Sequence, residues 1–402
     1  MSIFSAVTLA PADPILGTAL AFRADPSPSK VNLGIGAYRD NAGSPIVFES
    51  VRLAEQILLN KNMDKEYTTI DGSSILKPLT QSLLFGSENS SIFPRIASVQ
   101  TLSGTGALRV GGEFARLHLN PPCVLVSDPS WETHRSIFGK AGIPVKTYPY
   151  WDAETRNLNL TGFLASLNAA PTGSLVLLHA CAHNPTGLDP SEAQWLEILQ
   201  TIEAKGLVPF VDCAYQGFAS GDLDKDAWVV RHLLKNSNTE FFVAPSFAKN
   251  MGLYGERMGM LHVVTNQTDT ANKVLSQLKL VIRPMYSSPP LQGARIVETV
   301  LGSPDLRQLW VQELRAVADR IGEMRVLFKE RMEAKTGTGW GHVTNQIGMF
   351  SYTGVSEAQV EVLIGKWHIY MLKSGRISLA GLNHGNIDYV VEAFADVVVC
   401  SC

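Results

Sequence analysis

The chain has 402 residues, of which 45% are hydrophobic and 18% are charged, and its formal net charge is −3. This length exceeds what a single hydrophobic core usually serves, so two domains are expected. Because the charge balance is slightly acidic and long Lys/Arg clusters are missing, we expect neither nucleic acid nor anionic membranes as partners. No apolar run is long enough to cross a bilayer.

The two ends of the sequence and its cysteines bear on the compartment. The stretch MSIFSAVTLAPADPILG has neither the pattern of a secretory signal nor the Arg-rich pattern of a transit peptide, and VVVCSC is not a peroxisomal tripeptide. The five cysteines (123, 181, 213, 400 and 402) have no metal-ligand spacing. We therefore expect a cytoplasmic protein with reduced thiols and no metal site.

The first chemically informative segment is TLSGTGALRVGGEFARL, which starts at Thr101. Ser103, Gly104 and Thr105 stand just before a helical pattern. Small residues at a helix start leave backbone N–H groups and the positive end of the helix dipole open to a phosphate. An ordinary N-cap with a tight turn explains the same residues, so both interpretations stand for this segment alone.

Four short apolar runs in the middle of the chain predict buried strands. They are CVLVSDPSW from Cys123, SLVLLHACAHNPTG from Ser174, GLVPFVDCAYQGF from Gly206 and EFFVAPSFAKN from Glu240. Nearly continuous apolar runs of this length are typical of strands that are covered on both faces. Most segments between them, such as PSEAQWLEILQTIEAKG, are typical of helices. The alternation predicts an α/β fold with a mostly parallel sheet between helices.

Chemically distinctive residues follow the apolar part of each run. In chain order they are Trp131, Asn184, Asp212, Tyr215, Ser246 and Lys249. In an open parallel sheet, ligands bind beyond the carboxyl ends of the strands. These residues are therefore expected to meet at one site although they lie far apart in the sequence.

Each of these residues also has a purely structural explanation. Lys249 is either a solvated surface charge or an amine held in a pocket. Asp212 ends a buried strand and must pair with a cation or a strong donor, such as a protonated pyridine, or else cap a helix. Arg257 grips a phosphate or forms a surface ion pair. His183 is expected to be a core or turn residue, and the same structural explanation is open for His179.

After about Ser303 the pattern changes. DLRQLWVQELRAVADRIGEMRVLFKERMEAK predicts one long amphipathic helix. NQIGMFSYTG and WHIYMLKSGRISLAGL predict strands of a smaller α/β unit, which the N-terminal segment VNLGIGAYRD is expected to join. We place the small domain in residues 14–45 and 317–402 and the large domain in 46–316.

Together these segments resemble the aspartate aminotransferase family of pyridoxal-phosphate enzymes. The matching segments, in that family's order, are APADPILG, VNLGIGAYRD, KEYTTIDG, LSGTGALR, PSWETH, HACAHNPTG, VDCAYQGFASGDLDKDAW, SFAKNMGLYGERMG, IRPMYSSPPLQGARI, NQIGMFSYTG and SGRISLAGL. They cover nearly the whole chain. The resemblance implies a fold-type I transferase, with a large sheet domain that binds pyridoxal 5'-phosphate and a smaller α/β domain.

The resemblance also implies a role for each residue at the cofactor. Lys249 forms a Schiff base with the cofactor aldehyde and then acts as the acid and base, so its pKa should be lowered. Asp212 pairs with the pyridine nitrogen, with His134 behind it. Tyr215 donates to the phenolic oxygen and Trp131 stacks on the ring. The residues implied to hold the phosphate are Ser103, Gly104, Thr105, Ser246 and Arg257; Asn184 also donates to the phenolic oxygen.

Substrate contacts follow from the same resemblance. Arg376 matches the arginine for the α-carboxylate, assisted by Gly36 and Asn184, and Trp131 also contacts the substrate. Arg283 matches the arginine for the distal carboxylate. Two bidentate clamps select a dicarboxylic amino acid of defined length.

In this family the distal-carboxylate arginine comes from the neighbouring subunit. The resemblance therefore assigns Arg283 to the partner's site, together with Tyr67, which contacts the cofactor phosphate there. An N-terminal arm, residues 1–13, is implied to lie across the partner. A homodimer with shared active sites is expected.

The implied reaction is the reversible transfer of the amino group from L-aspartate to 2-oxoglutarate, which yields oxaloacetate and L-glutamate by a ping-pong route through the pyridoxamine form. A relative of broad specificity that also accepts aromatic amino acids remains an alternative. A lyase or decarboxylase on this fold is disfavoured by Arg283 and Arg376, and a non-enzymatic scaffold by the intact Lys249. Two departures stand out: Ala248 replaces a common serine and Ser288 a common asparagine.

Overall fold

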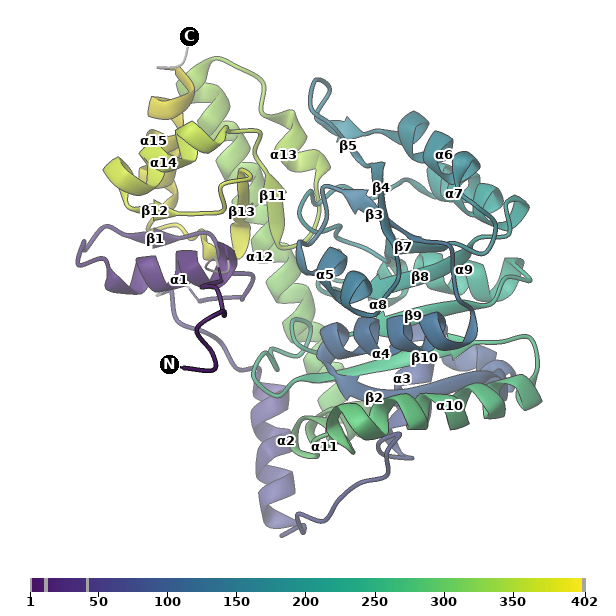
Figure 1. Ribbon diagram of the computed structural model, residues 1–402. Helices are drawn as coiled ribbons and strands as arrows, with labels where there is room; N and C mark the ends of the chain where they lie inside the picture. Colours follow the sequence, from purple (N-terminus) through teal and green to yellow (C-terminus); the bar gives the residue numbers. More distant parts are fainter. Residues whose placement is uncertain (1, 11–13, 41–42, 400–402) are drawn as a thin grey trace.

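The computed structural model describes the chain except residues 1, 11–13, 41–42 and 400–402 (Figure 1). The end of the expected N-terminal arm and the cysteines at 400 and 402 therefore lie outside the described residues. The largest element is a seven-stranded sheet in the order β2-β10-β9-β8-β7-β3-β4. Its strands are β2 (Ile96–Leu102), β3 (Val124–Asp128), β4 (Val145–Pro149), β7 (Leu175–His179), β8 (Val208–Cys213), β9 (Phe241–Pro245) and β10 (Met258–Val264).

This sheet confirms the predicted mostly parallel arrangement. The pairs β9–β8, β8–β7, β7–β3 and β3–β4 are all parallel. Only β10 runs against its neighbours, since it pairs antiparallel with both β2 and β9. The four apolar runs predicted as strands are β3, β7, β8 and β9.

Helices cover both faces of the sheet (Figure 1). One layer consists of α4 (Ser103–His118), α5 (Thr133–Lys140) and α10 (Thr268–Tyr286). The other consists of α3 (Leu76–Phe85), α6 (Leu160–Ala169), α7 (Glu192–Ala204) and α9 (Trp228–Asn236). In β7, Leu175 and Leu177 pack with the first layer, whereas Val176 and Leu178 pack with the second. Burial on both faces explains why these strands have continuous apolar runs.

The smaller unit brings the two ends of the chain together. Strand β1 (Val31–Asn32) pairs in parallel with β12 (Ile369–Tyr370), which confirms that the N-terminal segment joins the C-terminal one. Strand β11 (Phe350–Tyr352) pairs antiparallel with β13 (Arg376–Ser378). The helices here are α1 (Pro14–Ala24), α13 (Gly341–Asn345), α14 (Glu357–Trp367), α15 (Ile387–Val399) and the 3-10 helix η2 (Leu379–Gly381).

The remaining elements lie around the large sheet. They are α2 (Glu49–Asn60), the 3-10 helix η1 (Ser87–Arg95), the hairpin of β5 (Trp151–Asp152) and β6 (Asn157–Leu158), α8 (Leu223–Asp226) and α11 (Gln292–Gly302). Across the described ranges, none of the helices combines the length and apolar character needed to span a membrane.

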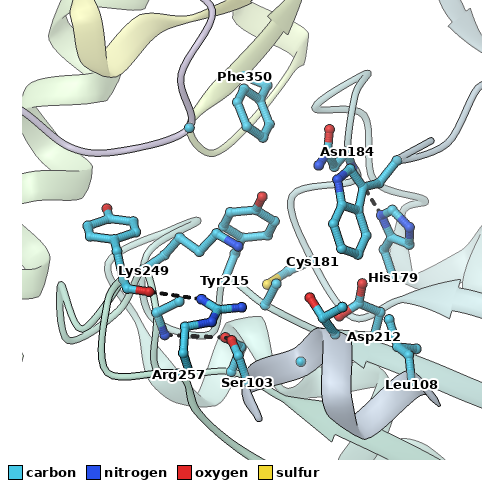
Figure 2. A pocket seen from close by; sticks show the side chains of 18 of the residues that line it. Ser103, Leu108, His179, Cys181, Asn184, Asp212, Tyr215, Lys249, Arg257 and Phe350 are labelled. Carbon is cyan, nitrogen blue, oxygen red and sulfur yellow. Dashed lines mark hydrogen bonds between the residues drawn. The ribbon is translucent and has the colours of Figure 1, made fainter. Parts of the chain in front are cut away.

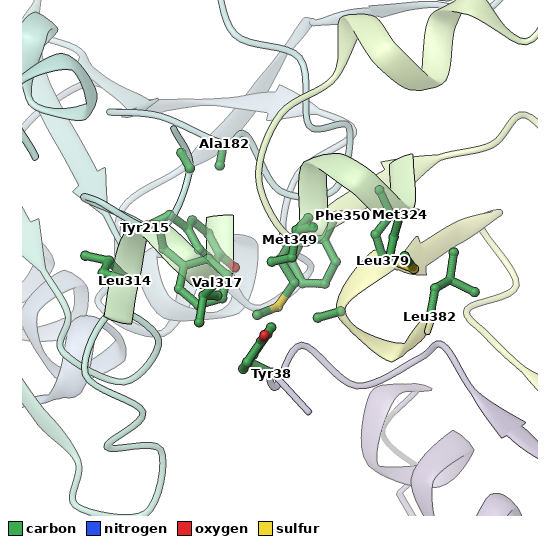
Figure 3. Close-up of a cluster of buried hydrophobic side chains, with 14 of the residues drawn as sticks. Tyr38, Ala182, Tyr215, Leu314, Val317, Met324, Met349, Phe350, Leu379 and Leu382 are labelled. Carbon is green, nitrogen blue, oxygen red and sulfur yellow. The ribbon is translucent and has the colours of Figure 1, made fainter. Parts of the chain in front are cut away.

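The long predicted helix is α12 (Pro304–Thr336), which has 33 residues. It begins where the Ser303 side chain accepts a hydrogen bond from the Leu306 N–H, and it ends at Gly337 in the left-handed conformation. Residues at helical spacing along it are buried, among them Leu314 and Val317. Figure 3 shows these two side chains beside Tyr215 of the large unit. The helix is thus continuous across the expected domain boundary at 316/317 and packs against both units.

A buried arginine in this helix holds the small unit's irregular backbone. The Arg325 guanidinium donates to the carbonyls of Val343, Gly348 and Phe350 at 2.7–2.9 Å. Burial lowers the pKa of Arg325 to about 9. Because three carbonyls depend on one side chain, the arginine fixes the segment that leads into β11.

Replacing this arginine should therefore be costly. We expect Arg325→Met to lower the free energy of unfolding by about 3 kcal/mol, because three buried carbonyls lose their donors. Urea denaturation measures the change. The control is Arg331→Met on the same helix, where an exposed ion pair with Asp388 is lost and the expected cost is below about 1 kcal/mol. Equal losses in the two variants would contradict the anchoring role of Arg325.

Candidate active site

The direction of the strands brings the predicted site residues to one edge of the sheet. The carboxyl ends of β2, β3, β7, β8 and β9 lie at this edge, together with the amino end of the reversed strand β10. A cavity of about 250 Å³ opens there. The predicted site residues that line it are Gly36, Ser103, Gly104, Thr105, Trp131, Asn184, Asp212, Tyr215, Ser246, Lys249, Arg257 and Arg376. Figure 2 shows how the labelled side chains converge.

The N-terminus of α4 forms one end of the cavity. Ser103, Gly104 and Thr105 are its first residues, and none of the described side chains caps this helix end. Ser103 has a positive φ of 62°. Gly104 packs closely against the end of β9, since a Cβ at this position would lie 3.3 Å from Ser246 Cβ. The N–H groups of this first turn that follow Ser103, with the positive end of the dipole, provide a place suited to an anion.

Neighbouring strand ends add a hydroxyl and a guanidinium to this place. Ser246 Oγ lies 3.0 Å from Ser103 Oγ and accepts a hydrogen bond from the Ala248 N–H at 3.2 Å. The Arg257 carbonyl accepts a hydrogen bond from the Ser103 N–H at 2.9 Å, which joins the start of β10 to the start of α4. The guanidinium of Arg257 donates to the Tyr254 carbonyl at 2.8 Å and lines the cavity. The arrangement fits a phosphate.

Lys249 lines the same cavity as the residues of this anion site. Its Nζ stands 5.3 Å from the centre of the Tyr215 ring. Burial lowers the pKa of Lys249, and the positive charges of Arg257 and Arg376 lower it further, whereas Asp212 acts in the opposite direction. A lysine in these surroundings is easily deprotonated, which is the state that a nucleophilic amine needs.

Asp212 at the end of β8 is held by a histidine. The His134 Nε2–H donates to Asp212 Oδ2 at 3.0 Å, and His134 Nδ1 lies 2.9 Å from Ser130 Oγ. Burial by itself raises the pKa of Asp212. The hydrogen bond and charge of His134, with the charge of Lys249, outweigh burial, so the pKa is lowered and the group is a carboxylate. Because His134 uses Oδ2, Oδ1 can pair with a cationic ring nitrogen.

His179 contributes to the same wall of the cavity. Its Nδ1 accepts a hydrogen bond from the Asn184 N–H at 3.0 Å, which leaves the proton on Nε2, and burial lowers its pKa to about 3. His134, His179 and Asp212 place three potential metal-ligand atoms within 4.8 Å of one another. The hydrogen bond between His134 and Asp212 already uses two of these atoms, so the geometry favours a supported carboxylate.

The small unit supplies a second cation to the cavity. Arg376 begins β13 and is 2% exposed. It donates to the Gly34 carbonyl at 2.7 Å and to Asn184 Oδ1 at 3.3 Å, and its guanidinium lies 4.1 Å from the centre of the Phe350 ring. Burial lowers the pKa of Arg376 to about 10. Its buried Nε has no partner among the described residues, so the guanidinium lines the cavity without all of its donors being satisfied there.

Two predicted site residues lie outside this cavity. Tyr67 is 85% exposed, and Arg283 is exposed near the end of α10 with one nitrogen bonded to Ser287 Oγ at 2.5 Å. Neither lines the cavity of its own chain.

Other residues that line the cavity were absent from the sequence-based prediction of the site. They are Leu108, His179, Cys181, Ala214, Ala248, Tyr254 and Phe350. The motifs that contain Tyr254 and Phe350, SFAKNMGLYGERMG and NQIGMFSYTG, were recognised, but nothing in them distinguishes these rings from core aromatics. The sequence left a structural explanation open for His179, and this residue is both buried and part of the wall.

Comparisons with known proteins agree with this fold and cavity. The family "Aminotransferase class I and II" matches residues 28–394. Aspartate aminotransferase 3, chloroplastic, of Arabidopsis thaliana is 49% identical over 400 residues, which are 99% of this chain and 89% of that protein. The cytoplasmic aspartate aminotransferase of Dictyostelium discoideum is 48% identical over 399 residues, 99% of this chain and 90% of that protein.

A solved structure is similar over the same length. The aromatic-amino-acid aminotransferase of Burkholderia pseudomallei, covalently bound to pyridoxal phosphate, superposes with a TM-score of 0.95 at 45% identity and covers 99% of this chain and 100% of that one. The chain therefore belongs to the class I and II aminotransferase family. The resemblance and the fold class expected from the sequence are confirmed, and the protein is a pyridoxal-phosphate-dependent aminotransferase.

The cavity has the chemical groups that this cofactor requires. An aldehyde needs an amine with a lowered pKa, and Lys249 offers one. A pyridine nitrogen needs a supported carboxylate, and Asp212 has the properties of one. A phenolic oxygen needs a donor, and burial raises the pKa of Tyr215, so its hydroxyl keeps the proton. The anion site at the start of α4 completes the match.

The lowered pKa of Lys249 has a consequence for stability. A lysine whose pKa falls on folding destabilises the fold at pH values below the folded pKa, and this penalty disappears as the pH rises toward the ordinary 10.5. We expect cofactor-free Lys249→Met to melt at a higher temperature than the cofactor-free wild type at pH 7, and the difference to shrink by pH 10. Differential scanning fluorimetry at both pH values measures it.

The control for this comparison is Lys140→Met, which changes an exposed lysine at the end of α5. Its melting temperature should follow the wild type at both pH values. A Lys249→Met variant that melts below the wild type at pH 7 would contradict the burial argument.

Proposed function

We propose that this enzyme is an aspartate aminotransferase, which transfers the amino group of L-aspartate to 2-oxoglutarate and yields oxaloacetate and L-glutamate in a reversible ping-pong reaction. The observation that carries the proposal is Arg376, a nearly buried guanidinium that faces the cavity beside Lys249 with Nε unpaired. A carboxylate of the substrate is the partner that such a group requires. The aspartate aminotransferases that share about half of its residues support the choice of substrate.

The residues divide the work as follows. Pyridoxal 5'-phosphate, when bound, withdraws electrons from the substrate and makes its Cα acidic. Lys249 Nζ takes the proton from the substrate Cα and then, as an acid, donates it again in the next step of the amino transfer. Its lowered pKa permits both steps. Asp212 keeps the ring nitrogen protonated, Tyr215 donates from its hydroxyl, and Trp131 covers the ring. Arg376 with Asn184 orients the α-carboxylate, next to Gly36.

Exclusion of water follows from how the cavity is divided between units. Gly36, Phe350 and Arg376 come from the segments 14–45 and 317–402, which we propose form the small domain, and Lys249 comes from the large domain, 46–316. A substrate that binds Arg376 is therefore pulled between the two domains. Their closure over it removes water from the Cα that loses its proton.

The distal carboxylate requires a second cation, and we propose that Arg283 of a partner subunit supplies it. Arg283 and Tyr67 are exposed and stand outside their own cavity. The N-terminal residues 2–10 are exposed as well, and they include Ile3 and Phe4, which are 89% and 70% exposed. A homodimer would cover these apolar residues and would complete each site with Tyr67 and Arg283 of the other subunit.

We also propose a cytoplasmic location. The support is the similarity to aspartate aminotransferases described as cytoplasmic, those of Dictyostelium discoideum and Oryza sativa subsp. japonica, which are each 48% identical to this chain. The relatives named above differ in compartment, since one is chloroplastic and two are cytoplasmic.

Broad specificity is the second candidate. The similarity to an aromatic-amino-acid aminotransferase favours it, as does Ser288, which stands near Arg283 where asparagine is common in aspartate aminotransferases. An exposed arginine on a helix end can rotate away from an aromatic side chain. The strict enzyme requires Arg283 to stay in place.

A coupled assay tests the proposed function. With aspartate and 2-oxoglutarate, the protein reconstituted with pyridoxal 5'-phosphate should form one glutamate for each oxaloacetate. We expect kcat/KM for aspartate to exceed that for phenylalanine by at least roughly 100-fold, because an aromatic ring leaves the arginine unpaired. Comparable values would establish the broad-specificity enzyme, and failure to form glutamate would refute an aminotransferase acting on aspartate.

Mixed dimers test the shared site. Lys249→Ala and Arg283→Ala homodimers should both be nearly inactive with aspartate. When the two variants are unfolded together and refolded at equal concentrations, each mixed dimer has one site with both residues intact. Random pairing then restores about a quarter of the wild-type activity. If Arg283 served its own subunit, mixing would restore nothing.

A further inference from the structure

The two residues proposed to reach the partner's site are tied to each other within one chain. Tyr67 lies in the segment between α2 and α3, and Arg283 lies in the last turn of α10. Asp71 follows Tyr67 by four positions, and Lys279 precedes Arg283 by four positions, one helical turn. Lys279 Nζ lies 3.3 Å from Asp71 Oδ1. One ion pair therefore links the two segments close to both residues.

Asp71 is built as an anchor. Its side chain is only 8% exposed, and it also forms an ion pair with Lys77 at the start of α3. Burial raises the pKa of Asp71, but the hydrogen bond and charge of Lys77 outweigh burial and lower it overall. The carboxylate thus keeps its charge, with one lysine from its own segment and one from α10.

Gln100 of β2 adds a second link between the same segments. Its N–H donates to the Asp71 carbonyl at 3.0 Å, and its Nε2 donates to the Pro290 carbonyl at 2.7 Å, just beyond α10. The Tyr286 hydroxyl donates to the Gln100 carbonyl at 3.4 Å. Gly72 has φ +83° and packs so closely that a Cβ there would lie 2.3 Å from Gln100 Cβ. Gln100 is 1% exposed, so this link is a fixed part of the core.

We propose that Asp71, Lys279 and Gln100 form a positioning brace that holds Tyr67 and Arg283 in one fixed relation. Through the brace, a subunit presents to its partner one rigid unit that contacts both the cofactor phosphate and the distal carboxylate of the substrate. The brace determines specificity, because a mobile Arg283 would reduce the difference in affinity between a dicarboxylic and an aromatic amino donor. The inference rests on the proposed shared-site function.

Asp71→Asn and Lys279→Met test the brace, with the homodimer reconstituted with pyridoxal 5'-phosphate. Both variants break the link between the segments. We expect each to raise KM for aspartate about tenfold, while kcat/KM for L-alanine, which has no distal carboxylate, changes less than twofold. Both should also release pyridoxal 5'-phosphate several-fold faster in a dilution experiment followed by absorbance, since Tyr67 is loosened.

The pair of variants separates positioning from simple charge. Asp71→Asn removes a negative charge near Arg283 and Lys279→Met removes a positive one, so a long-range electrostatic effect would change KM for aspartate in opposite directions. The brace requires the same direction in both. Lys273→Met is the matched control: it removes a lysine of the same helix α10 that forms an exposed ion pair with Asp269, it leaves the Asp71–Lys279 pair in place, and its KM for aspartate should stay within twofold of the wild type.

Opposite shifts in the two variants, an unchanged KM in both, or an equal loss with alanine and aspartate would each overturn the brace. The wild-type rate with aspartate and 2-oxoglutarate, measured in the same series, tests the proposed function separately. If the wild type does not turn over aspartate, the rate of cofactor release still decides whether the brace controls Tyr67.

Discussion

The arrangement of the cavity depends on one backbone contact, between the start of α4 and the start of the reversed strand β10. Strand β10 runs against the rest of the sheet, so its amino end lies beside the carboxyl ends of β2 and β9. The Ser103 N–H then donates to the Arg257 carbonyl, and the backbones approach so closely that a Cβ on Gly259 would lie 2.5 Å from the Ser103 carbonyl carbon. This contact places a guanidinium next to a helix N-terminus, and the anion site follows from it.

The charges of the cavity are unbalanced without a ligand. Lys249, Arg257 and Arg376 line it with one carboxylate among the described lining residues, that of Asp212, and burial makes the charges of Lys249, Arg376 and Asp212 costly. The proposed phosphate and substrate carboxylate would supply the missing negative charge. The charges of Arg257 and Arg376 also help to lower the pKa of Lys249, so groups that are proposed to bind ligands would at the same time prepare the lysine for chemistry.

The residues of the proposed substrate site come from three different parts of the structure. Arg376 is held by the small unit, Lys249 by the large one, and the proposed partner residue Arg283 by the end of α10. Helix α12 and the Arg325 anchor connect the first two, because the buried side of α12 packs against both units and Arg325 fixes the backbone that leads to Phe350. The Asp71–Lys279 pair connects the third to Tyr67. Because each part of the site is held by fixed contacts within its own unit, the proposed closure of the two domains would keep the positions of the residues in each part.

The class of fold and most of the residues at the cavity follow from sequence patterns and family motifs. The apolar runs at 123, 174, 206 and 240 are strands because only a strand covered on both faces tolerates such continuous hydrophobicity, and the family motifs identified Lys249, Asp212 and Arg257. Local patterns alone left each of them ambiguous, since a strand end with a polar residue is common.

Only the tertiary structure decided which residues share the site and how they are supported. His179 and Phe350 join the wall, because sheet order and strand direction determine which loops meet, whereas the position of Tyr67 and Arg283 outside the cavity of their own chain agrees with their expected place at the partner's site. The Asp71–Lys279 pair joins positions that are distant in the sequence, and neither residue belongs to a motif that reveals its partner. Periodicity reports whether a side chain is buried; contacts between distant segments depend on packing, which local patterns do not encode.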